Sequence, residues 1–311
     1  MTAPPTTPKP WRDAARRRLD TLRDDRAGWG YRPGQPPHVE PTVLADLGLL
    51  AVAAPAELPV AREIARIGGD WLLGLQNLDG SIGLSEQLSA PTWPTAHAIL
   101  LWGALDRAGD VPPRYQAARQ RAVDYLLKFE GRALPRSPDM LHDTTIPGWP
   151  WVQNTHMWVE PTAFALLALR AEGQGDHPRC RDGLRLLRDR SLPAGGWNYG
   201  NTVVLGAELR PHPGPSGIAL LGLQGDPASS EPVALGVKYL QGILPTLRAA
   251  PTLAPGLLAL AAWKQTPAAA EAWLAEAHAP AEKRSDVCYQ LAWLLAAAEP
   301  QRLLSMIGGS P

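Results

Sequence analysis

The sequence predicts an all-α protein, an (α/α)6 toroid of six helical hairpins arranged as an inner and an outer ring. Alanine and leucine dominate its apolar segments and β-branched runs are scarce, which favours helix over strand. One phrase is nearly repeated: "GWGYRPGQPPHVEPTVLADLGLLA" from Gly28 and "GWPWVQNTHMWVEPTAFALLAL" from Gly148. Such recurrence indicates a helical repeat architecture. The first unit resembles the third in full and lacks the polar cap of an open array, so we expect the ring to close.

Six segments are expected to form the inner ring, because they are small and apolar almost all round, as buried helices are. They begin at Val39, Trp93, Val159, Gly214, Ala250 and Ser285. Four of them carry a proline near the start, where a helix tolerates it. The more charged segments that precede them are expected outside; four of these end before Asn77, at Glu130, at Arg190 and at Leu244.

The chain is expected to hold one domain, residues 25–311, after a proline-rich polar tail and lead-in helix over residues 1–24. Residues 1 to about 12 are expected to be poorly ordered, because the tail "MTAPPTTPKP" buries little apolar surface. It has no apolar core of a signal peptide, and no apolar run approaches the ~20 residues of a membrane span. Two cysteines make no disulfide framework, so a cytoplasmic protein is expected.

Charge excludes some partners. Thirty basic and 30 acidic residues balance, which removes the electrostatic signature of a nucleic-acid-binding protein and gives no attraction to an anionic membrane surface. Aromatic usage is skewed, with 12 Trp against 2 Phe. Excess tryptophan indicates flat surfaces in loops or pockets, where the indole N–H finds a partner.

The loop "LLGLQNLDGSIG" (Leu72–Gly83), together with "GWGY" and "GGWNYGN", resembles the repeat of squalene–hopene and oxidosqualene cyclases over about residues 25–300. That superfamily includes protein prenyltransferase β subunits and thioester domains; the latter are disfavoured, since no Cys-Gly-Glu-Gln occurs. The resemblance implies a central cavity for an isoprenoid or similar apolar molecule. The cyclases' Asp-x-Asp-Asp acid is absent, and its nearest equivalent is Asp143 in "HDTTIPGW". Asp143 would need a raised pKa to act as an acid; its alternative role is a helix cap or turn residue.

The segment "PAEKRSDVCYQLAW" (Pro280–Trp293) resembles the zinc-site segment of prenyltransferase β subunits. This resemblance implies Asp286 and Cys288 as zinc ligands, Lys283 as a diphosphate contact and Tyr289 beside the ligand. No histidine follows Cys288, so we consider His38, which ring closure would bring near, as the third ligand. Alternatively, Asp286 caps a helix and Cys288 is a small buried residue.

Glu40, Glu160 and Asp286 occupy one equivalent position in three inner segments, so we expect them at one rim of the ring. Glu160 and Asp286, with Asp143, are the candidate catalytic acids. A purely structural explanation is the preference of acids for helix N-termini. The other ligand-binding candidates are rim and loop residues, of which we expect half or more to be packing aromatics: Trp29, Glu40, Trp149, Trp151, His156, Trp158, Trp197, Tyr199, Lys283 and Tyr289.

Two functions are compatible with these features. The first is an enzyme that transfers or cyclises a prenyl or terpenoid substrate, with or without zinc. The second is a non-catalytic binding or scaffold protein that kept the fold without the chemistry, since fold does not fix function.

Overall fold

The computed structural model describes residues 9–24, 28–109, 113–136, 140–204 and 206–308, and within them it is predominantly helical. The predicted all-α class is confirmed. Thirteen α-helices, two 3₁₀ turns (Pro227–Ser229 and Leu244–Thr246) and one short antiparallel hairpin (β1 Val203–Val204, β2 Ala207–Glu208) lie in these ranges.

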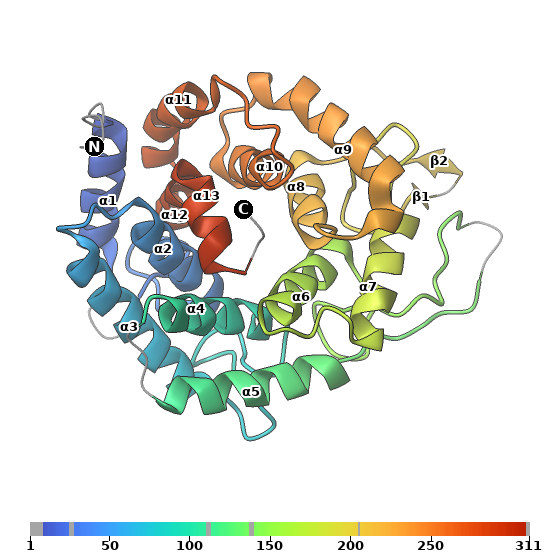
Figure 1. Ribbon diagram of the computed structural model, residues 1–311, viewed down its shortest axis with the longest axis horizontal. Helices are drawn as coiled ribbons and strands as arrows, with labels where there is room; N and C mark the ends of the chain where they lie inside the picture. The colour runs from blue at the N-terminus through green and yellow to red at the C-terminus, as the bar shows by residue number, and fades with distance from the viewer. Residues whose placement is uncertain (1–8, 25–27, 110–112, 137–139, 205, 309–311) are drawn as a thin grey trace.

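Twelve of the helices form two concentric layers (Figure 1). The inner helices are α2 (Val39–Val52), α4 (Thr95–Arg107), α6 (Val159–Ala171), α8 (Pro213–Gly222), α10 (Ala250–Ala262) and α12 (Val287–Ala298). The outer helices are α1 (Pro10–Leu22), α3 (Leu58–Leu75), α5 (Pro113–Lys128), α7 (Pro178–Asp189), α9 (Ser230–Ile243) and α11 (Ala270–Glu282). Each inner helix contacts the next, and α12 contacts α2. The short α13 (Pro300–Met306) packs on α10, α2 and α4.

Small residues let the inner helices approach closely where the two ends of the chain meet. A Cβ added to Gly48 of α2 would lie 2.9 Å from the backbone nitrogen of Ala296 in α12. Nearly all residues of both helices are buried, as expected of helices that are apolar on every side. Any larger side chain at Gly48 would therefore push these helices apart.

The repeated phrase and the related "GGWNYGN" build a link between an outer helix and the inner helix that follows it in three of the hairpins. The tryptophan backbone N–H donates to a hydroxyl on the inner helix: Trp29 to Thr42 (3.0 Å), Trp149 to Thr162 (2.9 Å) and Trp197 to Ser216 (2.8 Å). The indole N–H donates to a carbonyl of the preceding outer helix: Leu19 (2.8 Å), Leu126 (2.9 Å) and Leu187 (2.7 Å). The phrase therefore recurs because it builds the same link in the first, third and fourth hairpins.

Arginine side chains cover the C-terminal ends of the inner helices. Arg107 donates to the carbonyls of Ala171 (2.8 Å) and Met306 (2.7 Å), and Arg302 donates to that of Ala53 (2.6 Å). Arg170 binds three carbonyls that follow α8 or end it. Cations suit the negative end of a helix. This end of the ring is thus occupied by structural contacts. Glu40 and Glu160 lie at the opposite end, where α2 and α6 begin.

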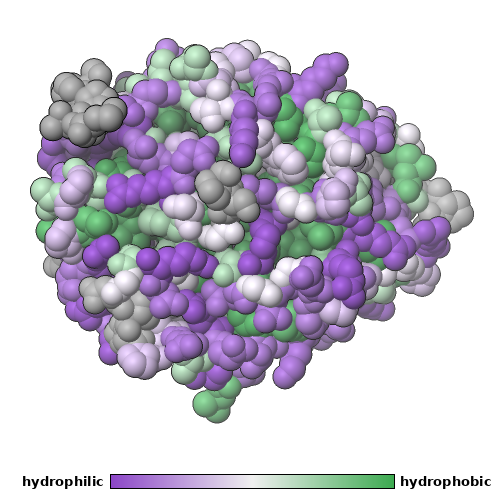
Figure 2. Space-filling view, in the orientation of Figure 1, coloured by the Kyte–Doolittle hydropathy of each residue, from purple (hydrophilic) through white to green (hydrophobic). Residues whose placement is uncertain are grey.

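On the face shown in Figure 2, hydrophilic residues predominate and hydrophobic ones are scattered among them. Within the described residues, none of the helices is both long enough and apolar enough to cross a bilayer.

The prediction that residues 1 to about 12 are poorly ordered is wrong from Pro10 onward. Residues 1–8 lie outside the described residues. Helix α1 begins at Pro10 and belongs to the outer layer, where it contacts α11 and α12. Trp11 and Arg12 are buried. The Arg12 guanidinium donates to the Ala298 carbonyl (2.6 Å) and pairs with the carboxylates of Glu271 and Glu299. These long-range contacts order a segment whose composition alone favoured disorder.

Arg12→Ala is expected to lower the free energy of unfolding by about 2 kcal/mol, because it removes charge-assisted hydrogen bonds at the closure of the ring. Urea denaturation of both proteins measures the difference. Arg18→Ala is the control, since Arg18 pairs with Glu282 at the surface (3.5 Å) and should change stability by under about 0.5 kcal/mol. Equal effects of the two substitutions would contradict the closing role of Arg12.

Candidate functional site

Glu40 lies at the second position of α2 and is the centre of a hydrogen-bonded group. Its carboxylate accepts from the hydroxyls of Tyr31 (2.5 Å) and Tyr289 (2.9 Å), which come from the preceding loop and from α12. The Tyr31 and Tyr289 rings are 5.2 Å apart. Burial raises the pKa of Glu40, while the two phenols lower it by stabilising the anion. The pKa of each phenol is raised by burial and by Glu40, so both remain donors.

Glu160 occupies the equivalent second position of α6 and has no hydrogen-bond partner among the described residues. Burial first, and then the negative charge of Glu40, raise the pKa of Glu160 to about 7. The two carboxylates therefore interact across the start of the inner ring. The two phenols stabilise the anion of Glu40, whereas Glu160 has no such donors in the described part of the chain and retains its proton close to neutrality. Both side chains stay partly solvent-accessible.

Aromatic side chains lie next to Glu160. Phe164, one turn further along α6, has its ring 4.3 Å from that of His97 on α4. Trp93 contacts His97 (4.8 Å) and Trp151 (4.9 Å), both in edge-on geometry. Burial lowers the pKa of His97 to about 3, and neither ring nitrogen has a partner among the described residues. His97 is thus a neutral group packed between the Trp93 and Phe164 rings.

A groove of about 430 Å³ lies between the third and fourth hairpins, beside the start of α6. The loop before α6 forms one wall and the loop between α7 and α8 forms the other. The Val159 N–H donates to the Tyr199 carbonyl (3.0 Å), which ties both walls to the turn that carries Glu160. The side chains that line the groove include Trp151, Trp158, Tyr199, Asn201, Arg210 and His212.

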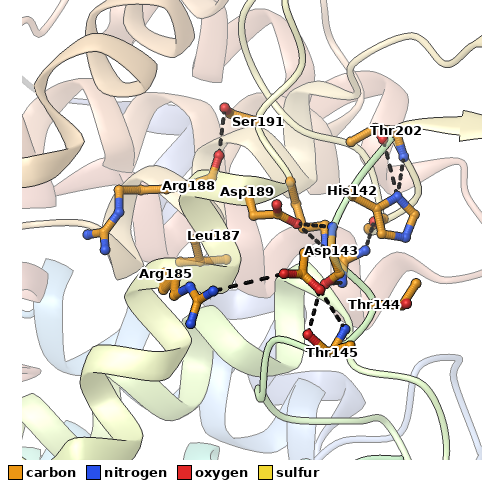
Figure 3. Close-up of polar contacts among 12 residues, drawn as sticks. His142, Asp143, Thr144, Thr145, Arg185, Leu187, Arg188, Asp189, Ser191 and Thr202 are labelled. Atoms are coloured by element: carbon orange, nitrogen blue, oxygen red, sulfur yellow. Dashed lines mark hydrogen bonds and ion pairs between the residues drawn. The ribbon is translucent and has the colours of Figure 1, made fainter. Parts of the chain in front are cut away.

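Asp143 is a turn residue, and its predicted role as an acid is wrong. Its carboxylate accepts from the Thr145 backbone N–H (3.0 Å) and hydroxyl (2.6 Å), and pairs with Arg136 and Arg185, as Figure 3 shows for Thr145 and Arg185. These contacts, the Arg136 bond foremost, hold the pKa of Asp143 well below its usual range. A carboxyl with a lowered pKa has no proton to donate near neutrality.

The residues predicted to bind zinc are not brought together. Asp286 precedes α12 and faces Gln290 (3.0 Å) and Arg284 (3.3 Å), and these partners lower its pKa. Cys288 is fully buried. His38 Nδ1 lies 2.9 Å from the carbonyl oxygen of Pro36. Lys283 ends α11 as an exposed C-cap. In the part of the chain that the structure describes, no cluster of three His, Cys, Asp or Glu side chains is placed to hold a metal.

The predicted aromatic contacts divide into two groups. Trp29, Trp149 and Trp197 are at most 1% exposed and form the links between helices, so their assignment to a ligand site is corrected. Trp151, Trp158 and Tyr199 line the groove. His156 packs behind Trp158, with ring centroids 4.9 Å apart.

Four residues of the candidate site were not among the predicted site residues: Tyr31, Trp93, His97 and Arg210. Tyr31 stands in the loop phrase "GWGY", where the aromatic pattern indicated packing. Trp93 precedes α4 at the position that Glu40 and Glu160 occupy in other repeats, and His97 follows it by about one turn; an aromatic in place of the acid is the signal that could have identified them.

Tyr31→Phe is expected to raise the pKa of Glu40 further, because it removes a hydrogen bond to the anion. A pH titration of the glutamate carboxyl ¹³C resonance measures this shift. Tyr125→Phe is the control, since the Tyr125 hydroxyl has no partner among the described residues. An unchanged Glu40 pKa in Tyr31→Phe would show that the Tyr31 contact does not stabilise the anion.

Comparison with known proteins establishes a shared fold. No protein-family model matches the chain, and none of the curated proteins is detectably similar to it in sequence. Similar solved structures include a glycosidase in complex with glucose (TM-score 0.60, 12% identity, 97% of each chain) and a protein from Actinoplanes (0.57, 15%, 95% of this chain and 99% of that one). Salmonella alpha-2-macroglobulin matches over 93% of this chain and 17% of its own (0.52, 18% identity).

Proposed function

We propose that the chain is an (α/α)6 toroid that hydrolyses a glycosidic bond with Glu160 as general acid and Glu40 as general base or nucleophile. One observation carries this proposal: two glutamates at equivalent inner-helix starts interact electrostatically, but within the described ranges only Glu40 accepts hydrogen bonds, from two phenols that stabilise its anion. Glycosidases use two carboxyl groups in such separate protonation states.

The chemistry follows from the two environments. Glu160 donates its proton to the leaving oxygen as the bond from that oxygen to the anomeric carbon breaks. In the inverting form, Glu40 takes a proton from the water that attacks the anomeric carbon. In the retaining form, Glu40 attacks that carbon directly, and water deprotonated by Glu160 then displaces Glu40 and releases the sugar. Tyr31 and Tyr289 keep Glu40 oriented and anionic through their hydrogen bonds. The optical rotation of the fresh product distinguishes the two forms.

Two further features support the proposal. Aromatic side chains beside Glu160 offer the flat faces on which a sugar ring packs. A glycosidase has the same fold over 97% of both chains, although at 12% identity this likeness bears on the fold alone.

A panel of aryl glycosides and oligosaccharides tests the activity. The expected result is turnover of at least one class by the wild type, with loss in both Glu160→Gln and Glu40→Gln. Azide added to Glu40→Gln or Glu40→Ala should restore turnover only if Glu40 is the base or nucleophile. Glu231→Gln, an exposed glutamate in the first turn of outer helix α9, is the matched control. Turnover that persists in Glu160→Gln would overturn the assignment.

Isoprenoid binding is the second candidate, as the cyclase-like repeat loops imply. The observation that favours it is the uncharged surface formed by Trp93, Trp151, Phe164 and neutral His97. Quenching of tryptophan fluorescence by farnesol tests it. Binding that is lost in Phe164→Ala would support this candidate, and an absence of quenching in the wild type would contradict it.

A further inference from the structure

We propose that the groove between the third and fourth hairpins binds a negatively charged sugar unit, whose ring packs on Trp158 and Tyr199 and whose anion pairs with Arg210. This inference rests on the proposed function, since it names the class of substrate that reaches Glu160. The groove is the binding subsite, and its lining residue Trp158 is the N-cap of α6, two residues before Glu160.

The shape of the groove fits a ring with polar edges. Trp151 and Trp158 form one side and Tyr199 the other, while Asn201 and His212 add polar groups. Its volume of about 430 Å³ lies within the range of small-molecule sites. A groove for a purely apolar chain would not need these polar side chains.

The charge of the groove is positive although the nearby rim is acidic. Arg210 is the sole Asp, Glu, Lys or Arg that lines it, and the Arg210 guanidinium has no ion pair or hydrogen bond with any described residue. Most other arginines near the walls are engaged, such as Arg190 with the Gly200 carbonyl (3.1 Å). An unpaired guanidinium beside aromatic faces is suited to a carboxylate or sulfate, which it can bind through two parallel hydrogen bonds.

The position of the groove connects it to the acid. Trp158 is two residues before Glu160, and a Cβ on Gly200 would lie 3.2 Å from the Trp158 ring, so the wall is tightly packed there. A sugar held on Trp158 is therefore bound two residues along the chain from Glu160, and the proposal places its neighbouring glycosidic bond at that carboxyl.

Binding is tested with Glu160→Gln protein, which should not turn substrate over, by calorimetry with trigalacturonate, a sulfated trisaccharide and neutral maltotriose. We expect at least one acidic ligand to bind about 10-fold or more tightly than the neutral one, a difference of about 1.4 kcal/mol. Arg210→Gln should abolish that preference, and Trp158→Ala should weaken the binding of all three. Preference for trigalacturonate or for the sulfated ligand identifies the anion.

Arg17→Gln is the matched control, because Arg17 is an exposed arginine of α1 outside the groove and its loss changes net charge equally. Equal affinity for acidic and neutral ligands, a preference that survives Arg210→Gln, or no binding would overturn the inference. Arg210-dependent binding of farnesyl diphosphate without saccharide binding would also overturn it. Binding of an acidic sugar without hydrolysis would support the groove inference and reject the proposed glycosidase activity. Hydrolysis of neutral glycosides that does not depend on Arg210 would support the glycosidase activity and reject the groove inference.

Discussion

Trp197→Ala is expected to lower the free energy of unfolding by about 3–5 kcal/mol, the usual cost of removing a large buried aromatic side chain. Trp197 is 0% exposed, and a Cβ on Gly236 of α9 would lie 2.6 Å from its ring, so the indole fills the space between α7, α8 and α9. The substitution also leaves the Leu187 carbonyl without the indole donor. Guanidinium denaturation measures the loss as a lower midpoint.

Two controls separate the contributions of Trp197. Trp197→Phe keeps most of the ring and removes the N–H, so it should cost less than Trp197→Ala by about 2 kcal/mol or more. Leu78→Ala alters a fully exposed apolar side chain and should change stability by under about 0.5 kcal/mol. A Trp197→Ala protein as stable as the wild type would show that the repeated phrase does not hold the hairpins together.

Much of the helical layout could be predicted because the inner helices are marked by composition. Val39, Val159 and Ala250 begin helices as predicted, and the others begin within about two residues of the predicted start. The predicted start at Trp93 is two residues early because Thr92 pairs with Val152 in a β-bridge and a turn at Trp93 and Pro94 leads into the helix at Thr95. Helix α13 was not predicted, since the "PQRLLSM" segment is short and continues an apolar run.

The candidate site was predicted less well, because side-chain partners come from distant repeats. Alignment of the inner segments of the chain with one another placed Glu40, Glu160 and Asp286 at equivalent positions. In the structure, however, Asp286 lies before its helix, whereas the two glutamates lie at the second helical position. Asp286 therefore faces Gln290 and Arg284, and Tyr289 reaches Glu40 instead. A single sequence does not reveal which hydroxyls stabilise which carboxylate, and this decides the protonation of Glu40 and Glu160.

Glu160→Gln is expected to reduce glycoside turnover by about 10²–10⁴-fold, the usual contribution of a general acid, while making the protein more stable above neutrality. The pKa of Glu160 is raised by burial and by Glu40 to about 7 in the folded state, from 4.5. Below pH 4.5 the carboxyl is protonated in both states and contributes nothing. As pH rises from 4.5 to 7, ionisation favours the unfolded chain, so folding stability is lost across that window.

Glutamine removes this pH dependence because it does not ionise. Each pKa unit corresponds to about 1.36 kcal/mol, so Glu160→Gln should gain up to about 3 kcal/mol over the wild type at pH 8 and almost nothing at pH 4. Urea denaturation at the two pH values, beside assays at pH 6, measures both effects. Glu231→Gln should change neither, since that side chain is exposed. Lost activity without a pH-dependent gain in stability would mean that Glu160 is not held protonated by its surroundings, and a gain in stability with full activity would mean that its proton serves no catalytic step.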